Sequence, residues 1–539
     1  MCIRDSNETE ATVTTKYERK FNSENAAVVD QEHLGGVIGQ CEGSIVDCTN
    51  RGTVDQASDP RTVNAGGICG FVRNAAESLS GNANEGEVRI GGAVTLATVG
   101  GVYGSFGKAQ TVADAATTNR GGVTVSGIES IEGAYLRLGG IVGFAYPGTV
   151  LSNLTNAGDM TVDLQSKFSY YAVGGIAGSV ECGASSCVNE GSLRLNNNQL
   201  LTKGMCKIFV GGIVGINYRP TDDGPHIYED CANRAEIGFA TTDNAFKVLP
   251  SFTGGILGYT EHPVEVRNCE GAAYINVNNA NAKENGIFTA TGGIVGAVKG
   301  TAALIEKCHV TADMRHYQYN NTWDDPLSAA NGGGIVGCAL GADEVNRIAI
   351  TGCSCSGMVE SKRSGAAGIV GYARFSDISD CGFTGGIEGS GPHFAGGIAG
   401  TLANSTIAGC TVKAKNIYGH NASSPSLIGV SGIAAYVVGV SSVSDCKAYA
   451  TLIRNSTVLG TEDASVTPDN LFGMGMIVGI DAGTTTVTNC GVGGSFYLGA
   501  SEKPQELILT LDADSYAKGI IGSGKTATVG GCYYWNGEE

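Results

Sequence analysis

Residues 139–143 read Gly-Gly-Ile-Val-Gly, and this block of three glycines around two apolar residues recurs along nearly the whole chain. The spacing between copies runs from 29 residues (367 to 396) to 44 residues (431 to 475). Such self-similarity at a nearly fixed period is the signature of a repeat protein. The copies begin at Gly35, Gly66, Gly100, Gly139, Gly174, Gly211, Gly254, Gly292, Gly333, Ala367, Gly396, Ser431, Gly475 and Lys518.

The composition also favours a repeat array. A chain of 539 residues is too long for one compact hydrophobic core. It contains 83 glycines, but hydrophobic residues still reach 42%, which is more than a glycine-rich disordered chain contains. Glycine does not occur at every third residue, so a collagen helix is excluded.

A second mark follows most of the blocks. In eleven copies it is a cysteine: Cys48, Cys187, Cys231, Cys269, Cys308, Cys353, Cys381, Cys410, Cys446, Cys490 and Cys532. In the first six copies an asparagine lies at or just after this point: Asn50, Asn84, Asn119, Asn156, Asn189 and Asn233. From the seventh copy onward this asparagine is replaced by other residues.

Each repeat contains about three short β-type runs separated by glycine and polar turns, and helical spacing is scarce. Strands this short bury their faces only by stacking on the equivalent strands of neighbouring repeats, about 4.8 Å apart. The sequence therefore predicts an all-β fold, a parallel β-solenoid (β-helix) of about fourteen glycine-rich repeats. We expect solenoid repeats with the asparagine mark over 34–253, and repeats without it, including a C-terminal cap, over 254–539.

Stacking explains the choice of residues at the repeated positions. A charged side chain there would meet its own charge at every coil, and like charges at this spacing repel by roughly 1 kcal/mol even in water. Paired glycines are typical of a sharp corner, where glycine permits a positive φ and neighbouring coils approach closely. Stacked asparagine amides can hydrogen-bond from coil to coil. The loss of asparagine after the sixth copy predicts a different corner geometry in the second part.

The first residues are set apart from the fold. Residues 1–6 (MCIRDS) resemble a translated sequencing adapter, so we exclude them, and we expect a signal or lipid anchor to be lost from this fragment. Residues 7–33 are polar and are interpreted as an N-terminal segment or cap. No transmembrane span is predicted, because the best apolar stretch, 427–443, is short and interrupted by glycine and serine.

The Gly-Gly-Ile-Val-Gly block followed by a cysteine or asparagine resembles the GLUG repeat, and the resemblance covers about residues 34–537. It implies a bacterial surface or secreted protein, often from Bacteroidota, similar to adhesins and to the N-terminal regions of IgA-protease-type proteins. Adhesion or contact with glycans is the function that the resemblance implies.

The charge balance excludes some partners. A net charge of −18 argues against nucleic acid and against anionic lipid surfaces, since both require a basic face.

The 18 cysteines are interpreted first as packing residues. Those of the repeat form a column of buried thiols that behave as small hydrophobic groups. The alternatives are disulfides between coils, whose Cα spacing permits a bridge, or a bridge between Cys182 and Cys187. Cys353-Ser354-Cys355 is the only close pair that suggests a metal, and no histidine lies at ligand spacing. We therefore predict no metal and no cofactor.

No catalytic motif is found. The acidic pairs Asp222-Asp223, Asp324-Asp325 and Asp512-x-Asp514 suit calcium or, more simply, solvated turns. Tyr317, Tyr319 and Trp323 lie in one insertion, as sugar-stacking residues or as a loop that covers the coil. Insertions carry recognition on repeat scaffolds, and the candidates are 217–226, 315–327 and 455–470.

We therefore expect a non-enzymatic, adhesin-like scaffold, extracellular or on the outer-membrane surface, that presents loops to a glycan or a protein partner. The alternative is a carbohydrate-active β-helix enzyme, a polysaccharide lyase or a glycoside hydrolase. Carboxylates grouped with a basic residue on one sheet face would favour the enzyme.

Overall fold

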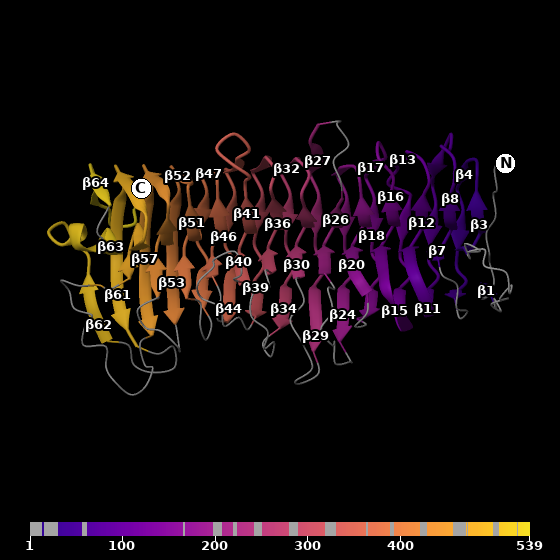
Figure 1. Cartoon of the computed structure of the whole chain (residues 1–539), viewed down its shortest axis with the longest axis horizontal. Coiled ribbons are helices and arrows are strands. Elements are labelled where there is room, and N and C mark those ends of the chain that lie inside the picture. Colours follow the sequence, from indigo (N-terminus) through magenta and orange to yellow (C-terminus); the bar gives the residue numbers. More distant parts are fainter. Residues whose placement is uncertain are drawn as a thin grey trace. The chain divides into compact units, whose positions relative to one another are not determined.

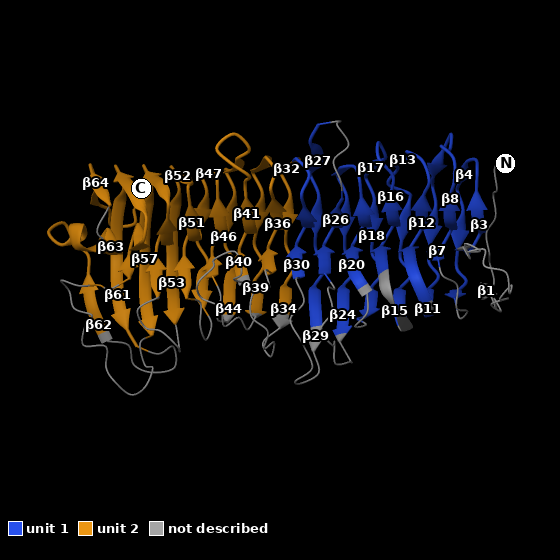
Figure 2. Cartoon of the chain, in the orientation of Figure 1, with its two compact units in different colours: residues 1–263 blue, residues 264–539 orange. Residues whose placement is uncertain are grey.

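The computed structural model consists of two compact units, residues 1–263 and 264–539 (Figure 2). It describes residues 13–15, 31–56, 62–164, 168–197, 207–218, 224–241, 251–279, 289–318, 330–362, 365–388, 393–420, 428–455, 471, 473–499, 506–524 and 527–538. Residues 1–6 and most of 7–33 thus lie outside the described part. Two strands of that segment are described, β1 (Val13–Thr15) and β2 (Gln31–Gly35).

The predicted all-β fold is confirmed: the described residues form parallel sheets and contain no α-helix. One repeat has five strands, more than the three short runs that the sequence predicts. An example is β20 (Phe168–Gly174), β21 (Ala177–Val180), β22 (Ala184–Ser185), β23 (Val188–Asn189) and β24 (Leu193–Asn197). The extra strands were missed because β22 and β23 are two residues long, too short for an alternating pattern.

In unit 1, equivalent strands of successive repeats lie side by side and pair in parallel (Figure 1). The first sheet, before each glycine pair, contains β2, β7 (Thr62–Gly66), β11 (Val88–Gly100), β15 (Val123–Gly139), β20, β25 (Lys207–Gly211) and β30 (Ser251–Gly254). The second sheet, after the pair, contains β3 (Ile38–Cys41), β8 (Cys69–Val72), β12 (Tyr103–Phe106), β16 (Val142–Ala145), β21, β26 (Val214–Asn217) and β31 (Leu257–Thr260). The third sheet contains β13 (Thr111–Ala113), β17 (Val150–Ser152), β22 and β27 (His226–Glu229), and the first two repeats form the pair β4 (Ile45–Val46) and β9 (Leu79–Ser80).

Each coil of unit 1 closes through short strands that return to the first sheet. They are β5 (Thr49–Asn50), β10 (Ala83–Asn84), β14 (Thr118–Asn119), β18 (Thr155–Asn156), β23 and β28 (Ala232–Asn233), followed by β6 (Val54–Gln56), β19 (Met160–Asp163), β24 and β29 (Ile237–Thr241).

Unit 2 repeats the arrangement. Its first sheet contains β35 (Thr289–Gly292), β40 (Ala330–Gly333), β45 (Gly365–Ala367), β50 (Phe394–Gly396), β54 (Gly429–Ser431) and β58 (Met474–Gly475). Its second sheet contains β36 (Val295–Lys299), β41 (Val336–Leu340), β46 (Val370–Arg374), β51 (Ala399–Ala403), β55 (Ala434–Val438), β59 (Val478–Asp481) and β63 (Ile521–Gly524). Its third sheet contains β32 (Val264–Arg267), β37 (Ala303–Glu306), β42 (Ile348–Thr351), β47 (Ser376–Ser379), β52 (Thr406–Ala408), β56 (Val440–Ser444), β60 (Thr484–Thr488) and β64 (Thr528–Gly530).

The closing strands of unit 2 pair from coil to coil in the same way. They are β33 (Glu270–Gly271), β38 (His309–Val310), β43 (Ser354–Cys355), β48 (Gly382–Phe383), β34 (Ile275–Asn279), β39 (Met314–Gln318), β44 (Met358–Lys362), β49 (Gly386–Glu388), β53 (Thr411–His420), β57 (Lys447–Asn455), β61 (Gly491–Leu498) and β65 (Tyr533–Tyr534).

The three glycines of a block lie where backbones cross, as Gly139, Gly140 and Gly143 illustrate. A Cβ on any of them would lie under 3.0 Å from backbone atoms, which real Cβ atoms essentially never do. The first glycine faces carbonyls of its own block and the next coil, the second faces the next coil and the side chain of Asn156, and the third faces the previous coil. None of the three has a positive φ. The predicted close approach is therefore correct, whereas the predicted positive φ is wrong at this corner.

The left-handed backbone occurs at a different corner, in the residue before the cysteine position. Asp, Asn and Ser occupy it in most repeats, because their short polar side chains tolerate this conformation better than other non-glycine residues do. The non-glycine examples, with φ between 51° and 57°, are Asp47, Asn153, Ser186, Asp230, Asn268, Lys307, Asp380, Asp445 and Asn489.

The core lies between the sheets. The isoleucine of the block is 0% exposed in successive repeats, as at Ile141, Ile176 and Ile213. Full burial of such a side chain stabilises the fold by about 1.5–3 kcal/mol, so the stacked isoleucines form a continuous apolar column in each unit.

The C-terminal end of unit 2 is covered by added structure. Strand β62 (Glu506–Thr510) pairs antiparallel with β61, and the 3₁₀ helix η3 (Tyr516–Gly519) follows. Trp535 is 7% exposed and lies 5.4 Å and 5.6 Å from the ammonium groups of Lys413 and Lys447. The side chain of Trp535 thus covers part of this end.

Replacing Gly397 by alanine should destabilise unit 2 by about 2–4 kcal/mol. The new methyl group would lie under 3.0 Å from the carbonyl oxygen of Gly432 and from Val412. Urea unfolding followed by circular dichroism measures the change. Gly382→Ala is the matched control, because an added Cβ there meets nothing within 4 Å. Equal stability of the two variants would contradict the close-approach explanation.

Candidate functional site

The six asparagines of unit 1 form one buried hydrogen-bonded column. The amide nitrogen Nδ2 of each asparagine donates to the Oδ1 of the next over 2.8–2.9 Å, from Asn50 through to Asn233. Each Nδ2 also donates to the backbone carbonyl two residues ahead, as from Asn119 to Gly121 at 2.9 Å. All six are 0% exposed. Their amides are satisfied inside the coil, so the column is structural.

The corner geometry does not change when the asparagine is lost, so the sequence-based prediction of a different corner is wrong for the first repeats of unit 2. The two-residue strands β33, β38, β43 and β48 remain. The space is filled instead by apolar or sulfur-containing side chains such as Val310, Cys355 and Phe383, which pack against the second glycine of a block. Only β53, β57 and β61 run straight through this point.

The repeat cysteines of unit 2 lie in register on successive coils. Each thiol donates to the carbonyl two residues earlier, as Cys381 does to Ser379 at 3.2 Å and Cys446 to Ser444 at 3.2 Å. This position follows the left-handed corner residue, so the thiol satisfies a carbonyl at the turn. In unit 1 the column is interrupted: Cys48, Cys187 and Cys231 share it with Asn82, Thr117 and Leu154.

The sixteen described cysteines are all free thiols, and fifteen are buried. Cys182 and Cys187 are therefore not bridged. Burial raises the pKa of the Cys182 and Cys355 thiols to about 12. Cys2 and Cys206 lie outside the described residues. Within the described ranges, no group of three or more His, Cys, Asp or Glu side chains is arranged to hold a metal ion.

Most of the insertions predicted to carry function lie outside the described residues. This applies to Asp222-Asp223, Asp324-Asp325, Tyr319, Trp323, half of 217–226 and most of 315–327 and 455–470. Asp512 is described, and its carboxylate accepts hydrogen bonds from the backbone of Asp514 and Ser515, as in a solvated turn.

An aromatic face, missed in the sequence, lies on the outside of unit 1 beside the glycine corner. We define it as Tyr135, Arg137, Phe144, Tyr170, Phe209, Phe252 and Tyr259. The rings of Tyr135 and Tyr170 stack at 5.1 Å. The Arg137 guanidinium lies 4.5 Å from the centroid of the Phe144 ring and donates to the Tyr170 hydroxyl at 3.2 Å. Phe209, Phe252 and Tyr259 continue the contacts with centroids 4.7–5.6 Å apart.

Part of this face is open to solvent. Tyr135, Arg137, Phe144 and Tyr170 are half-buried, whereas Phe209 and Phe252, both 5% exposed, are covered. The open rings offer flat apolar surfaces, and the arginine beside them offers N–H donors in a fixed fork.

Two exposed tyrosines flank a glutamate on the neighbouring corner. Tyr146, Glu181 and Tyr218 each follow the second-sheet strand of three successive coils, and Tyr146 and Tyr218 are 37% and 42% exposed. Glu181 also lines a shallow groove of about 350 Å³ over β17, β22 and β27, together with Val150 and Ile227 among others. A larger hollow of about 490 Å³, near Glu42 and Glu77, has no aromatic lining residue.

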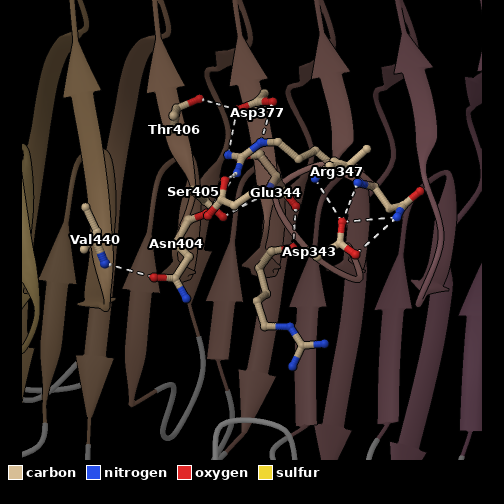
Figure 3. Close-up of polar contacts among 12 residues, drawn as sticks. Asp343, Glu344, Arg347, Asp377, Asn404, Ser405, Thr406 and Val440 are labelled. Atoms are coloured by element: carbon tan, nitrogen blue, oxygen red, sulfur yellow. Dashed lines mark hydrogen bonds and ion pairs between the residues drawn. The ribbon is translucent and has the colours of Figure 1, made fainter.

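Figure 3 shows a second surface feature, a loop of unit 2 between β41 and β42 that is clamped by Arg347. The guanidinium donates to both oxygens of Asp377 at 2.8 Å and to Glu344 at 2.6 Å. Thr406 donates to the same Asp377 carboxylate at 2.7 Å. At the loop tip Val345 is 88% exposed. The clamp thus holds an apolar side chain out in solvent.

Unit 2 also has two places where carboxylates meet an arginine on the third sheet, the pattern expected to favour an enzyme. Arg267 lies 2.6 Å from Glu265 and 3.3 Å from Glu306, and Arg347 binds Asp377. Burial pushes the pKa of Asp377 upward, but hydrogen bonds from Arg347 and Thr406 lower it overall. A carboxylate held ionised in this way is not suited to act as a general acid, and we interpret the contact of Asp377 with Arg347 as an ion pair.

Comparison of the chain with protein-family models, with curated proteins and with solved structures finds no match. No helix among the described residues has the length and apolar character needed to cross a membrane.

The asparagine column predicts a large cost for a single break. Asn119→Val removes one amide, so the buried Nδ2 of Asn84 loses one of its two acceptors and the Oδ1 of Asn156 loses one of its two donors, and we expect a loss of about 1–3 kcal/mol in the free energy of unfolding. Valine occupies the equivalent position of unit 2 at Val310, so the size of the side chain alone would not explain a loss of stability. Urea unfolding measures the change, and a loss below about 1 kcal/mol would show that the amide chain adds little.

We expect the free energy of unfolding of unit 2 to fall in acid because of His316. It is fully buried, its Nδ1 lies 2.7 Å from the Thr291 hydroxyl, and its Nε2 has no partner. Burial lowers its pKa from 6.5 to about 4. Because the folded-state pKa is the lower one, its stabilising contribution is complete above pH 6.5 and is lost as the pH falls toward 4, by up to about 3 kcal/mol.

Urea unfolding between pH 7 and pH 4 measures this slope. His316→Ser, which introduces the residue found one coil later at Ser361, should flatten it. His309→Ser is the control, because His309 is an exposed histidine of the same unit. An unchanged slope in His316→Ser would assign the acid sensitivity to other groups.

Proposed function

We propose that the chain is a non-enzymatic scaffold that binds a glycan through the aromatic face and the neighbouring tyrosine corner of unit 1. In this proposal it is adhesin-like, belongs with the GLUG-repeat proteins that it resembles, and acts outside the cell or on the outer-membrane surface.

The observation that carries the proposal is the combination of half-buried aromatic rings with one arginine on the outside of an otherwise closed coil. Sugar rings have apolar C–H faces edged by hydroxyl groups. Aromatic rings match the apolar faces. In this proposal Arg137 donates hydrogen bonds to the hydroxyl groups and Glu181 accepts hydrogen bonds from them. Tyr146 and Tyr218 are two coils apart, about 10 Å, a separation comparable to the length of a disaccharide.

The rival is a polysaccharide lyase or a glycoside hydrolase. It needs carboxylates free to exchange protons or to bind a metal. The grouped carboxylates of unit 2 that are described above are paired with Arg267 and Arg347, which supports binding without catalysis.

A glycan array of microbial and host polysaccharides, followed by titration calorimetry with the best ligand, tests the proposal. Tyr146→Ala/Tyr218→Ala should lower the affinity about tenfold or more, because each lost stacking contact costs about 0.5–1.5 kcal/mol. Tyr533→Ala is the matched control, since Tyr533 of unit 2 is also 42% exposed.

Two results would overturn the proposal. One is the absence of binding to every polysaccharide on the array. The other is the appearance of new reducing or unsaturated sugar ends on incubation with the protein, which would favour the enzyme.

A further inference from the structure

The cysteine column of unit 2 is a continuous chain of neighbouring sulfur atoms. Strand register places its members on consecutive coils. Each thiol lies beside the thiol of the next coil, near enough to shift its pKa, and all are buried. The seven members are Cys269, Cys308, Cys353, Cys381, Cys410, Cys446 and Cys490.

The column stabilises thiolates at some positions. The neighbouring sulfurs lower the pKa of Cys353 and of Cys446, although burial opposes the shift. At Cys381 and Cys410, a neighbouring sulfur and burial raise the pKa instead. The column thus favours the thiolate at some positions, and the thiolate is the form of cysteine that binds metals.

The spacing of the sulfurs suits a two-coordinate ion. Equivalent atoms on adjacent coils are about 4.8 Å apart. Two metal–sulfur bonds of about 2.3 Å, the length in zinc–thiolate sites, span about 4.6 Å. Three or four ligands do not converge anywhere in the described residues, so zinc is not favoured. Soft monovalent ions accept two thiolates in a line, and sulfur ligands select them.

We propose that adjacent cysteines of this column bind a soft monovalent cation, Cu(I) or Ag(I), between them. Two S–H bonds break, two metal–sulfur bonds form, and two protons leave to solvent. Where one sulfur is already a thiolate, a single proton leaves. No atom changes oxidation state. The ion enters through local opening of the coil, so loading is slow.

Silver nitrate in chloride-free buffer is the probe. After overnight incubation and gel filtration, native mass spectrometry counts the retained ions, and near-ultraviolet absorption reports the silver–thiolate bonds. The expected result is several ions per chain, with fewer thiols available to a thiol reagent after unfolding. Silver that is lost on gel filtration would overturn the proposal.

Two variants with equal numbers of thiols distinguish silver binding between adjacent cysteines from binding that depends only on the number of cysteines. Both carry Cys269→Ala, Cys353→Ala and Cys490→Ala. Adding Cys308→Ala leaves the adjacent set Cys381, Cys410 and Cys446. Adding Cys410→Ala instead leaves Cys308, Cys381 and Cys446, no two of which are neighbours.

The adjacent variant should retain silver in the column, and the separated variant should retain no more than the cysteines outside the column hold in both variants. Equal retention would overturn the proposal. Circular dichroism checks that both variants fold. If alanine prevents folding, serine replaces it, because its hydroxyl can donate to the same turn carbonyl.

Discussion

The fold depends on the close approach of backbones at the three glycines of each block. At Gly139, Gly140 and Gly143 there is no room for a Cβ, because backbone atoms of the same, the next and the previous coil occupy that space. The crossing therefore fixes how each coil is placed on its neighbour within a unit. Once it is fixed, the strands that follow inherit the same register, and equivalent side chains are brought into columns.

Because equivalent side chains stack in columns, a residue suits a buried position only if it packs or bonds well with the equivalent residues of the neighbouring coils. An asparagine of the column in unit 1 is accommodated because its two N–H groups find acceptors, as those of Asn50 do in Asn84 and in the carbonyl of Gly52. A lone amide at that depth would be costly. Thiols and apolar side chains repeat without this requirement, and they fill the equivalent space in unit 2, as Val310 and Cys355 do. The two units thus share one backbone design with two kinds of filling.

The columns and the parallel solenoid could be predicted from the sequence, because spacing alone places Cys308 over Cys353 and Asn84 over Asn119. The aromatic face could not. Tyr135 and Tyr170 become neighbours only when the register of outward positions is known, and the repeat pattern marks inward positions. The contact between Arg347 and Asp377 could not be predicted either, because the two residues are 30 positions apart and belong to different coils. A positive φ was expected at the glycine pair because glycine permits it. The glycines are required there for another reason, since the neighbouring backbones leave no space for a Cβ.

The aromatic face is local, and this limits what it can bind. The register places Thr98 and Ser105 one coil before Arg137 and Phe144, so the aromatic surface begins abruptly at β15 and extends over four coils to β30. Its open rings, Tyr135, Phe144 and Tyr170, lie on the first two of these coils, whereas Phe209 and Phe252 are covered. Together with the tyrosine corner, which extends over two coil spacings or about 10 Å, this face matches a short stretch of about two sugars in the function that we propose. In the function that we propose, recognition therefore lies where the outward positions stop repeating, and we expect a terminal or branch-point oligosaccharide to fit this face better than a long uniform polymer.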